Sequence, residues 1–182
     1  MEKMKDEVEA REKMKGMIND LPIDVVTDII NIYNPIIHVD RSVSPTYPDW
    51  VRKVLYPELE LVGPSDYDVT RLYQWLHPKQ VSDNATGYEI HDELIAKKMI
   101  EDCLGLPDLL AIQARGIGFF RKHYSGKAVF GWRSVVQFLN GNFKIPYLIE
   151  REGEVLLFWS WLDFSWLSNF PALCFSKELL EL

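Results

Sequence analysis

A chain of 182 residues is long enough to bury one hydrophobic core and short for two domains. Its composition, 47% apolar and 26% charged with a net charge of −7, excludes a largely disordered or low-complexity protein. No apolar run approaches the roughly 20 residues that span a bilayer, and the start of the chain lacks the apolar core of a signal peptide. Cys103 and Cys174 are too few for a disulfide framework or a four-cysteine zinc site, and we expect both in the core. We therefore expect a cytoplasmic protein without a membrane span, a metal or a cofactor.

Helical spacing of apolar residues dominates the first 124 residues. Pro22 suits a first helical turn and Asn34-Pro35 ends the helix that follows it. Capping-box patterns at Ser65/Asp68 and Thr86/Glu89 predict two further helix starts. The predicted helices cover residues 1–18, 22–33, 49–55, 69–76, 87–103 and 108–123, and one short strand covers residues 36–39.

The apolar period changes from helical to alternating after residue 127. Residues 128–139, 143–150 and 154–162 have the β-branched and aromatic content of strands. Asn140-Gly141 predicts a two-residue hairpin turn between the first two strands, and Glu152-Gly153 marks the next turn. We therefore predict one α+β domain over residues 1–182. Its parts are a helical half (1–124), packed on an antiparallel β-meander (127–163), and an aromatic tail (164–182).

A basic segment interrupts this acidic chain. Residues 109–149 contain no Asp or Glu, and their cations alternate with aromatic residues. Nucleic-acid-binding proteins use cations to neutralise phosphates and aromatic rings to stack on unpaired bases. The alternative is structural: cations also stabilise helix C-termini, and aromatic residues are common in the cores of proteins. The candidate nucleic-acid-binding residues are Arg115, Arg121, Lys122, Lys127, Arg133 and Lys144.

Tryptophans are concentrated near the C-terminal end. On a strand, Trp159 and Trp161 lie on one face, and the neighbouring positions on the other face are also apolar in part. Either the sheet is covered on both sides, or one face is kept for a protein partner, where Trp is enriched. Trp159, Trp161 and Trp166 are therefore candidates for a protein interface, with burial in the core as the alternative.

Three histidines and one aspartate are the candidate catalytic residues. Alternation along the predicted strand places His38 and Asp40 on the same side, the composition of a general base held by a carboxylate. His91 lies inside a predicted helix, and His123 belongs to the basic segment. If the histidines converged in the fold, metal-independent cleavage of RNA would be chemically reasonable. Whether the protein is an enzyme remains open at this point.

Six segments of the chain have familiar sequences: His38-Val39-Asp40-Arg41-Ser42, Tyr47-Pro48-Asp49-Trp50-Val51, Pro57-Glu58-Leu59-Glu60, Gly126-Lys127-Ala128-Val129-Phe130-Gly131-Trp132, Trp161-Leu162-Asp163 and Pro171-Ala172-Leu173. Together they resemble a group of small bacterial and mobile-element proteins over most of the chain. A compact acidic chain of this size is also similar to the type II anti-CRISPR proteins, which inhibit an RNA-guided DNA nuclease; this second resemblance rests on size and charge. Anti-CRISPR families share no common site, so the resemblance assigns no residue.

The resemblance implies an inhibitor that binds the CRISPR nuclease, its guide RNA or both. An acidic face would suit the cationic nucleic-acid channel of the nuclease, and the basic segment would suit the guide RNA, with cleavage of that RNA as a further option. Two alternatives stay open. One is a stand-alone hydrolase or nuclease that uses His38, Asp40 or His123, and the other is a non-catalytic protein-interaction module. The sequence leaves the oligomeric state open.

Overall fold

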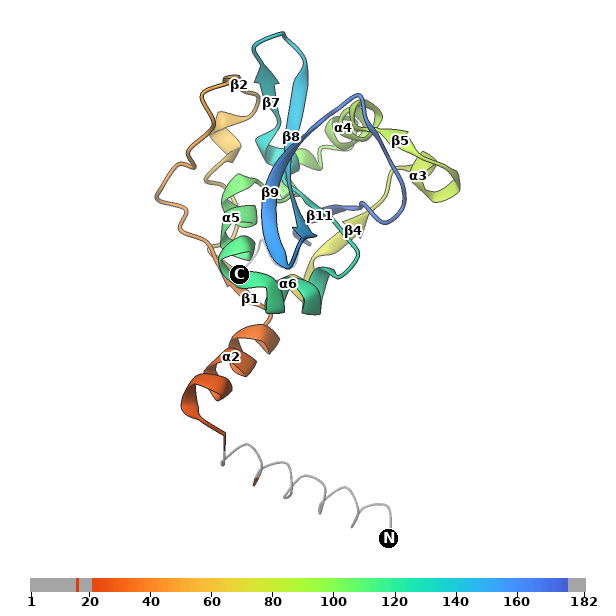
Figure 1. Cartoon of the computed structure of the whole chain (residues 1–182). Coiled ribbons are helices and arrows are strands. Elements are labelled where there is room, and N and C mark those ends of the chain that lie inside the picture. The colour runs from red at the N-terminus through yellow and green to blue at the C-terminus, as the bar shows by residue number, and fades with distance from the viewer. Residues whose placement is uncertain (1–15, 17–20, 177–182) are drawn as a thin grey trace. The chain divides into compact units, whose positions relative to one another are not determined.

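The computed structural model describes residue 16 and residues 21–176. The predicted helix over residues 1–18, apart from Gly16, and the last six residues of the predicted aromatic tail lie outside the described residues. Contacts between Cα atoms divide the chain into two compact units, Met1–Asn34 and Pro35–Leu182. Helices and antiparallel strands are both present, which confirms the α+β class (Figure 1). No helix among the described residues is both long and apolar enough to cross a bilayer.

The described part of the first unit contains one helix, α2 (Ile23–Tyr33). It follows Pro22 and ends where the backbone N–H of Asn34 donates to the carbonyl of Ile30 at 2.8 Å, as the sequence predicts. None of its residues is buried; Ile23 and Tyr33 are 81% and 60% exposed. A helix of this length gains little stability from its own hydrogen bonds in water, so most such helices depend on packing against other residues.

A five-stranded antiparallel sheet forms the centre of the second unit (Figure 1). Leu148 of the long central strand pairs with Val129 on one side and with Leu157 on the other. The central strand therefore has β6 and β7 along one edge and β9 along the other, and β2 extends the sheet beyond β7. The strands are β2 (Val51–Val54), β6 (Val129–Phe130), β7 (Val136–Phe138), β8 (Phe143–Arg151) and β9 (Glu154–Trp161).

Both predicted hairpins are present, with different turns. Glu152 and Gly153 have φ angles of 54° and 84° and join β8 to β9 as a two-residue turn. In the other hairpin only Gly141 has a positive φ, of 90°, and Phe138 accepts from Gly141 while donating to the carbonyl of Asn142. A type I′ turn needs a positive φ at both central residues, and Asn140 does not have one. The Asn140-Gly141 connection is therefore longer than the predicted two-residue turn.

Two helices predicted in the first half of the chain are wrong. Residues 49–55 contain β2, whose Val51 and Val54 pair with β7. Residues 69–76 form a 3-10 turn, η2 (Val69–Arg71), and then strand β4 (Tyr73–Trp75); strand β3 (Asp66–Asp68) comes before the turn. Asp68 does cap this turn, since its carboxylate accepts from the N–H of Thr70 at 2.8 Å. Pairing with distant strands outweighs local helix propensity here. β3 pairs with β1 (Ile36–His38) and β4 pairs with β11 (Ala172–Cys174).

The Thr86/Glu89 capping box is confirmed at the start of α4 (Gly87–Ala96). This helix ends earlier than predicted, because Lys98 takes a φ of 56° and Met99 donates back to the carbonyl of Leu94. That arrangement is a Schellman ending in which lysine replaces the usual glycine, so the sequence gives little signal for it.

The predicted helix over residues 108–123 is divided, and so is the predicted strand over residues 128–139. Gly116, with a φ of 76°, separates α5 (Leu106–Ala114) from α6 (Gly116–Tyr124). A 3-10 turn, η4 (Trp132–Ser134), separates β6 from β7 and directs Arg133 and Ser134 into the core. The remaining short elements are η1 (Pro57–Leu59), α3 (Pro78–Ser82), β5 (Ala85–Thr86), η3 (Ile100–Asp102) and β10 (Ser165–Trp166).

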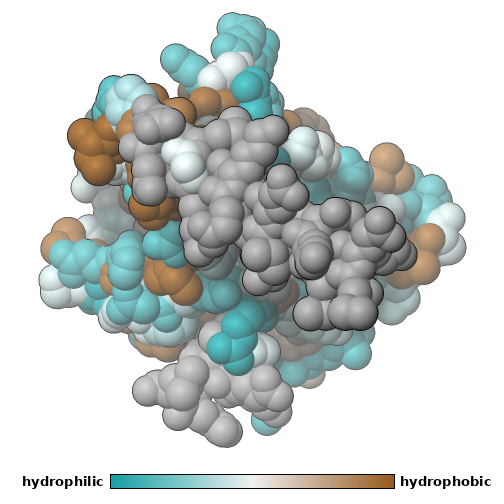
Figure 2. Space-filling model, turned by 90° about the horizontal axis from the view of Figure 1, so that it is seen from below, coloured by the Kyte–Doolittle hydropathy of each residue, from teal (hydrophilic) through white to brown (hydrophobic). Residues whose placement is uncertain are grey.

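Two buried clusters cover opposite faces of β8 and β9. Side chains of α5 and α6 pack with Leu148 and Val155 on one face. Side chains of α4 pack with Ile145 and Leu162 on the other. Hydrophobic residues also reach the surface in several separate places among hydrophilic ones, so surface hydrophobicity alone does not locate a site (Figure 2).

Gly87 offers a test of this packing. A Cβ at residue 87 would lie 2.6 Å from the ring of Trp166 and 2.8 Å from the Cα of Leu162. We expect Gly87→Ala to destabilise the protein by about 1–3 kcal/mol through overpacking, measured as a lower melting temperature by circular dichroism. Gly16→Ala is the control, because a Cβ at residue 16 meets nothing within 4 Å. An unchanged melting temperature for Gly87→Ala would contradict this packing.

Candidate interaction surface

Three of the six candidate nucleic-acid-binding cations are engaged by neighbouring side chains or backbone at the protein surface. Arg115 lies 4.4 Å from the ring centre of Phe119 and donates to the carbonyl of Ile36. Arg121 forms an exposed ion pair with Glu150 at 2.6 Å. Lys127 donates to the side-chain oxygen of Gln74 at 3.1 Å, and Lys122 is exposed on α6. Arg115, Arg121 and Lys127 therefore already have contact partners within the protein.

Arg133 is not on the surface. Its side chain is fully buried and forms an ion pair with the equally buried Asp108 at 2.7 Å. A second guanidinium, that of Arg41, bonds the same carboxylate at 2.5 Å, and the backbone N–H of Gly105 donates to it at 2.8 Å. The prediction that Arg133 contacts nucleic acid is therefore wrong, since its charge is already neutralised inside the protein.

A second buried carboxylate, Glu60, lies beside this cluster. It accepts hydrogen bonds from the hydroxyls of Tyr47, at 2.5 Å, and Ser134, at 3.1 Å. Burial raises the pKa of Glu60, while the two hydroxyl donors oppose that rise. Burial and the Glu60 carboxylate also raise the pKa of Tyr47 well above its ordinary value. Glu60 is only 5% exposed, so a substrate would not reach its carboxylate. Its hydrogen bonds instead hold the segments that carry Tyr47 and Ser134 next to each other.

The candidate catalytic residues lie in different parts of the second unit. His38 is exposed on β1 and contacts Asp66 of the neighbouring strand, whereas Asp40 accepts from the N–H and hydroxyl of Ser42. These two bonds lower the pKa of Asp40. The predicted His38–Asp40 pair is therefore replaced by His38–Asp66, because cross-strand register brings those two residues together.

The other two histidines have separate surroundings. His91 is buried on α4, where its Nε2 lies 2.9 Å from the hydroxyl of Tyr56 and its ring faces Trp132. His123 packs on Phe119 of α6. Asp40 and His123 also line different cavities, of about 380 and 110 Å³. The histidines thus give no shared catalytic arrangement, and the described residues include no cluster of three potential metal ligands.

The three candidate interface tryptophans divide between the core and the surface. Trp166 is 7% exposed and its ring centre lies 4.8 Å from that of Phe130, so it belongs to the core. Trp159 and Trp161 are half-buried on one face of β9, as the alternation predicts. Beyond the part of this face that α5 and α6 cover, the two tryptophans meet aromatic residues from other segments.

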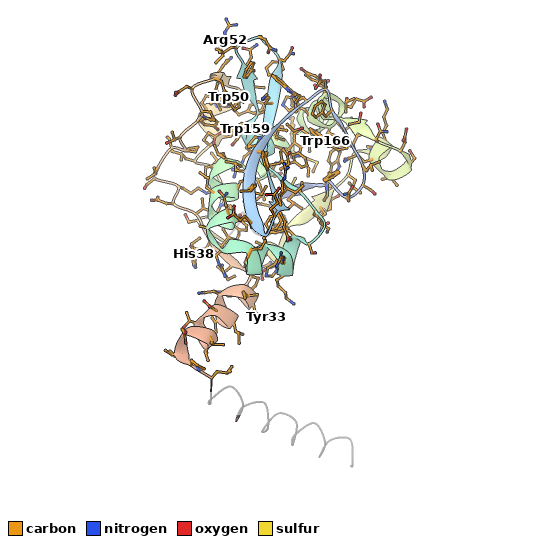
Figure 3. The ribbon with its side chains drawn as sticks, viewed as in Figure 1. Tyr33, His38, Trp50, Arg52, Trp159 and Trp166 are labelled. Carbon is orange, nitrogen blue, oxygen red and sulfur yellow. The ribbon has the colours of Figure 1, made fainter. Side chains whose placement is uncertain are left out.

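This aromatic face contains residues from the segment before β2, from the β7–β8 hairpin and from β9. Trp50 contacts Trp159 edge-on, with ring centres 5.1 Å apart, and lies 5.5 Å from Phe138. Trp159 also approaches Tyr47, and Trp161 lies edge-on to Phe138 at 5.2 Å. Figure 3 labels Trp50 and Trp159 close together, in agreement with this contact. We define the aromatic face as Tyr47, Trp50, Phe138, Trp159, Trp161 and Lys144.

Lys144 occupies the middle of the aromatic face. Its Nζ lies 4.0 Å from the ring centre of Trp161, 4.8 Å from that of Trp50 and 5.0 Å from that of Phe138. A cation among three rings is held by their negative faces, and partial burial strengthens this attraction. Lys144, proposed from sequence as a phosphate contact, thus organises an aromatic cluster.

Two exposed residues lie close in the chain to members of the aromatic face. Arg52 lies two residues after Trp50 in the chain and projects at the end of the sheet (Figure 3). Within residues 21–176, Arg52 is in none of the ion pairs with a carboxylate. Leu139, next to Phe138 in the hairpin, is 63% exposed. Sequence reasoning missed Trp50 and Arg52 as site residues, because it assigned them to a helix; the β-branched Val51 and Val54 were the available signal for a strand.

Comparisons with family models, curated proteins and solved structures found no match. Function is therefore inferred from side-chain contacts.

The buried Asp108 should be essential for stability. We expect Asp108→Asn to destabilise the protein by about 3–5 kcal/mol, because it leaves Arg41 and Arg133 without their counter-charge in the core. Glu150→Gln is the matched control, since it removes a carboxylate from an arginine pair at the surface, where solvent screens the attraction and the contribution to stability is small. Urea denaturation measures both. Equal losses for the two variants would contradict the assigned role of Asp108.

His91 should make stability depend on pH. Burial lowers the pKa of His91, an effect that Asp92 opposes in part, so the unfolded chain binds a proton more readily than the folded one. Stability is then present above the unfolded pKa, near 6.5, and is lost as the pH falls toward the folded pKa. We expect the melting temperature of the native chain, relative to His91→Gln, to fall between pH 7.5 and pH 5.5 by roughly a few degrees. Parallel pH profiles for the two proteins would contradict it.

Proposed function

We propose that this protein is a non-catalytic binding protein that docks onto another protein through the aromatic face. The observation that carries this proposal is the convergence of aromatic residues from three separate segments around the amino group of Lys144. Tryptophan and tyrosine dominate the centres of protein interfaces, since they bury much surface at a small cost in side-chain entropy. The exposed Arg52 and Leu139, close in the chain to its members, add a charged and an apolar contact.

The contacts within the aromatic face favour a protein partner over a nucleic acid. Stacking a base requires an open ring face. Lys144 lies over the ring of Trp161, and Trp159 is edge-on to Trp50 at 89°. A base would therefore have to displace these contacts. The net charge of −7 also opposes association with a polyanion.

The partner to test first is the one that the anti-CRISPR resemblance implies, an RNA-guided type II nuclease with its guide RNA. In that role the aromatic face would contact the nuclease protein, and the acidic remainder of the chain would suit the cationic channel that holds nucleic acid. The contacts that Arg115, Arg121 and Lys127 already make within the protein, and the burial of Arg133, argue against direct recognition of the RNA. The separation of the histidines argues against its cleavage.

The experiment measures binding of the purified protein to three immobilised ligands by interferometry: the nuclease alone, the nuclease with guide RNA, and the guide RNA alone. We expect binding to the nuclease in either state and none to free RNA, with the RNA intact on a denaturing gel. Equal binding to free RNA, or shortened RNA, would overturn the proposal in favour of RNA recognition or catalysis. Absence of all binding would remove this nuclease as the partner.

A pair of double variants tests the surface. Arg52→Glu with Leu139→Glu changes two exposed side chains close in the chain to members of the aromatic face, and we expect at least tenfold weaker binding. Lys98→Glu with Ile95→Glu makes the same kinds of change at the end of α4 and should leave binding unchanged. Melting temperatures confirm that both proteins fold. Equal binding by the two would exclude the aromatic face as the contact.

A further inference from the structure

Cys103 and Cys174 meet in the core although 71 residues separate them in the chain. Cys174 ends β11, and Cys103 lies between η3 and α5. The two form an isolated antiparallel bridge. Leu104 donates to the carbonyl of Leu173 at 3.0 Å, and Phe175 donates to the carbonyl of Asp102 at 2.7 Å. These two bonds flank the cysteines on both sides, so the cysteines occupy the non-hydrogen-bonded, closely spaced type of antiparallel pair.

This position suits a disulfide. Residues opposite each other in a non-hydrogen-bonded pair have Cα atoms about 4.5 Å apart, which falls inside the range of about 4.4–6.8 Å found for disulfides. The side chains already point at each other, with Sγ atoms 3.1 Å apart. Bond formation therefore requires rotation and a short approach of the sulfur atoms, without a change in the register of the two backbones.

We propose that Cys103 and Cys174 are a redox modification site. The two cysteines form a disulfide with each other by thiol–disulfide exchange with a small-molecule disulfide such as oxidised glutathione. The thiolate of one cysteine attacks oxidised glutathione, forming a mixed disulfide and releasing one glutathione thiolate. The second cysteine then attacks the protein sulfur of that mixed disulfide and releases the second glutathione. The two protein thiols lose two protons and two electrons, and one glutathione disulfide becomes two thiols.

Burial determines when the reaction occurs. Both cysteines are almost fully buried, at 0% and 1% exposure. Burial and the neighbouring Cys174 raise the pKa of Cys103, which keeps it as the unreactive thiol. The folded reduced protein therefore resists oxidation, and exchange takes place before β11 docks or while it is transiently open. Once formed, the bond closes a loop that contains α5, α6 and strands β6–β9, which restricts the unfolded chain and stabilises the fold.

The test compares full-length protein refolded from urea in a mixture of reduced and oxidised glutathione with protein refolded in dithiothreitol. We expect the first sample to lose the mass of two hydrogen atoms, to resist alkylation in denaturant, and to melt roughly 5–15 °C higher. A peptide map should join the segments that contain Cys103 and Cys174. Cys174→Ser is the control; it should gain at most one glutathione and melt at the same temperature in both buffers after reduction of that adduct.

Three results would overturn the proposal: two free thiols after refolding in glutathione, a separate glutathione on each cysteine, or disulfides only between molecules. Native protein in a series of sub-denaturing urea concentrations provides a second measurement that does not depend on refolding yield. There, the rate of disulfide formation should rise with urea, because urea increases the population of open states. A rate that is independent of urea would contradict the requirement for opening.

Discussion

The carboxylate of Asp108 lies fully buried between two guanidinium groups, and the second unit is organised around it. Arg41 comes from the loop after β1, Arg133 from η4 between two strands of the sheet, and Asp108 from the first turn of α5. Arg133 also bonds the carbonyl of Val62, and Arg41 bonds that of Pro64. Because each of these groups would carry a large desolvation cost if it were buried alone, their pairing favours keeping the three segments together.

This buried cluster is connected to the aromatic face through Tyr47. Its hydroxyl donates inward to Glu60, which Ser134 next to Arg133 also binds, while its ring contacts Trp159 outward. The same residue is thus held by the polar core and supports the surface. The hydrogen bond to Glu60 fixes the position of the Tyr47 ring against Trp159. Side chains that are already held in one arrangement lose less entropy when a surface binds a partner. That pre-organisation is consistent with a role in binding and requires no catalytic group.

The coverage of the sheet explains where the aromatic face lies. Helices α5 and α6 cover the part of β8 and β9 near Leu148 and Val155. They do not extend over Lys144 and Trp161 at the other end of the strands, so large aromatic rings and the stem of a lysine cover the sheet there instead. Long cationic side chains serve this purpose well, because their methylene groups pack on apolar surface while the charge stays near water or an aromatic ring.

The sequence by itself determined the α+β class, the helix after Pro22, the capping box of α4, the two hairpins and the shared face of Trp159 and Trp161, because each depends on local conformation or strand alternation. Only the tertiary structure decided which cations are buried, which carboxylate meets His38 and that Cys103 faces Cys174. It also decided that residues 51–54 form a strand. These features depend on pairing between segments far apart in the chain, where long-range packing and charge neutralisation outweigh the small differences in local propensity that a single sequence shows.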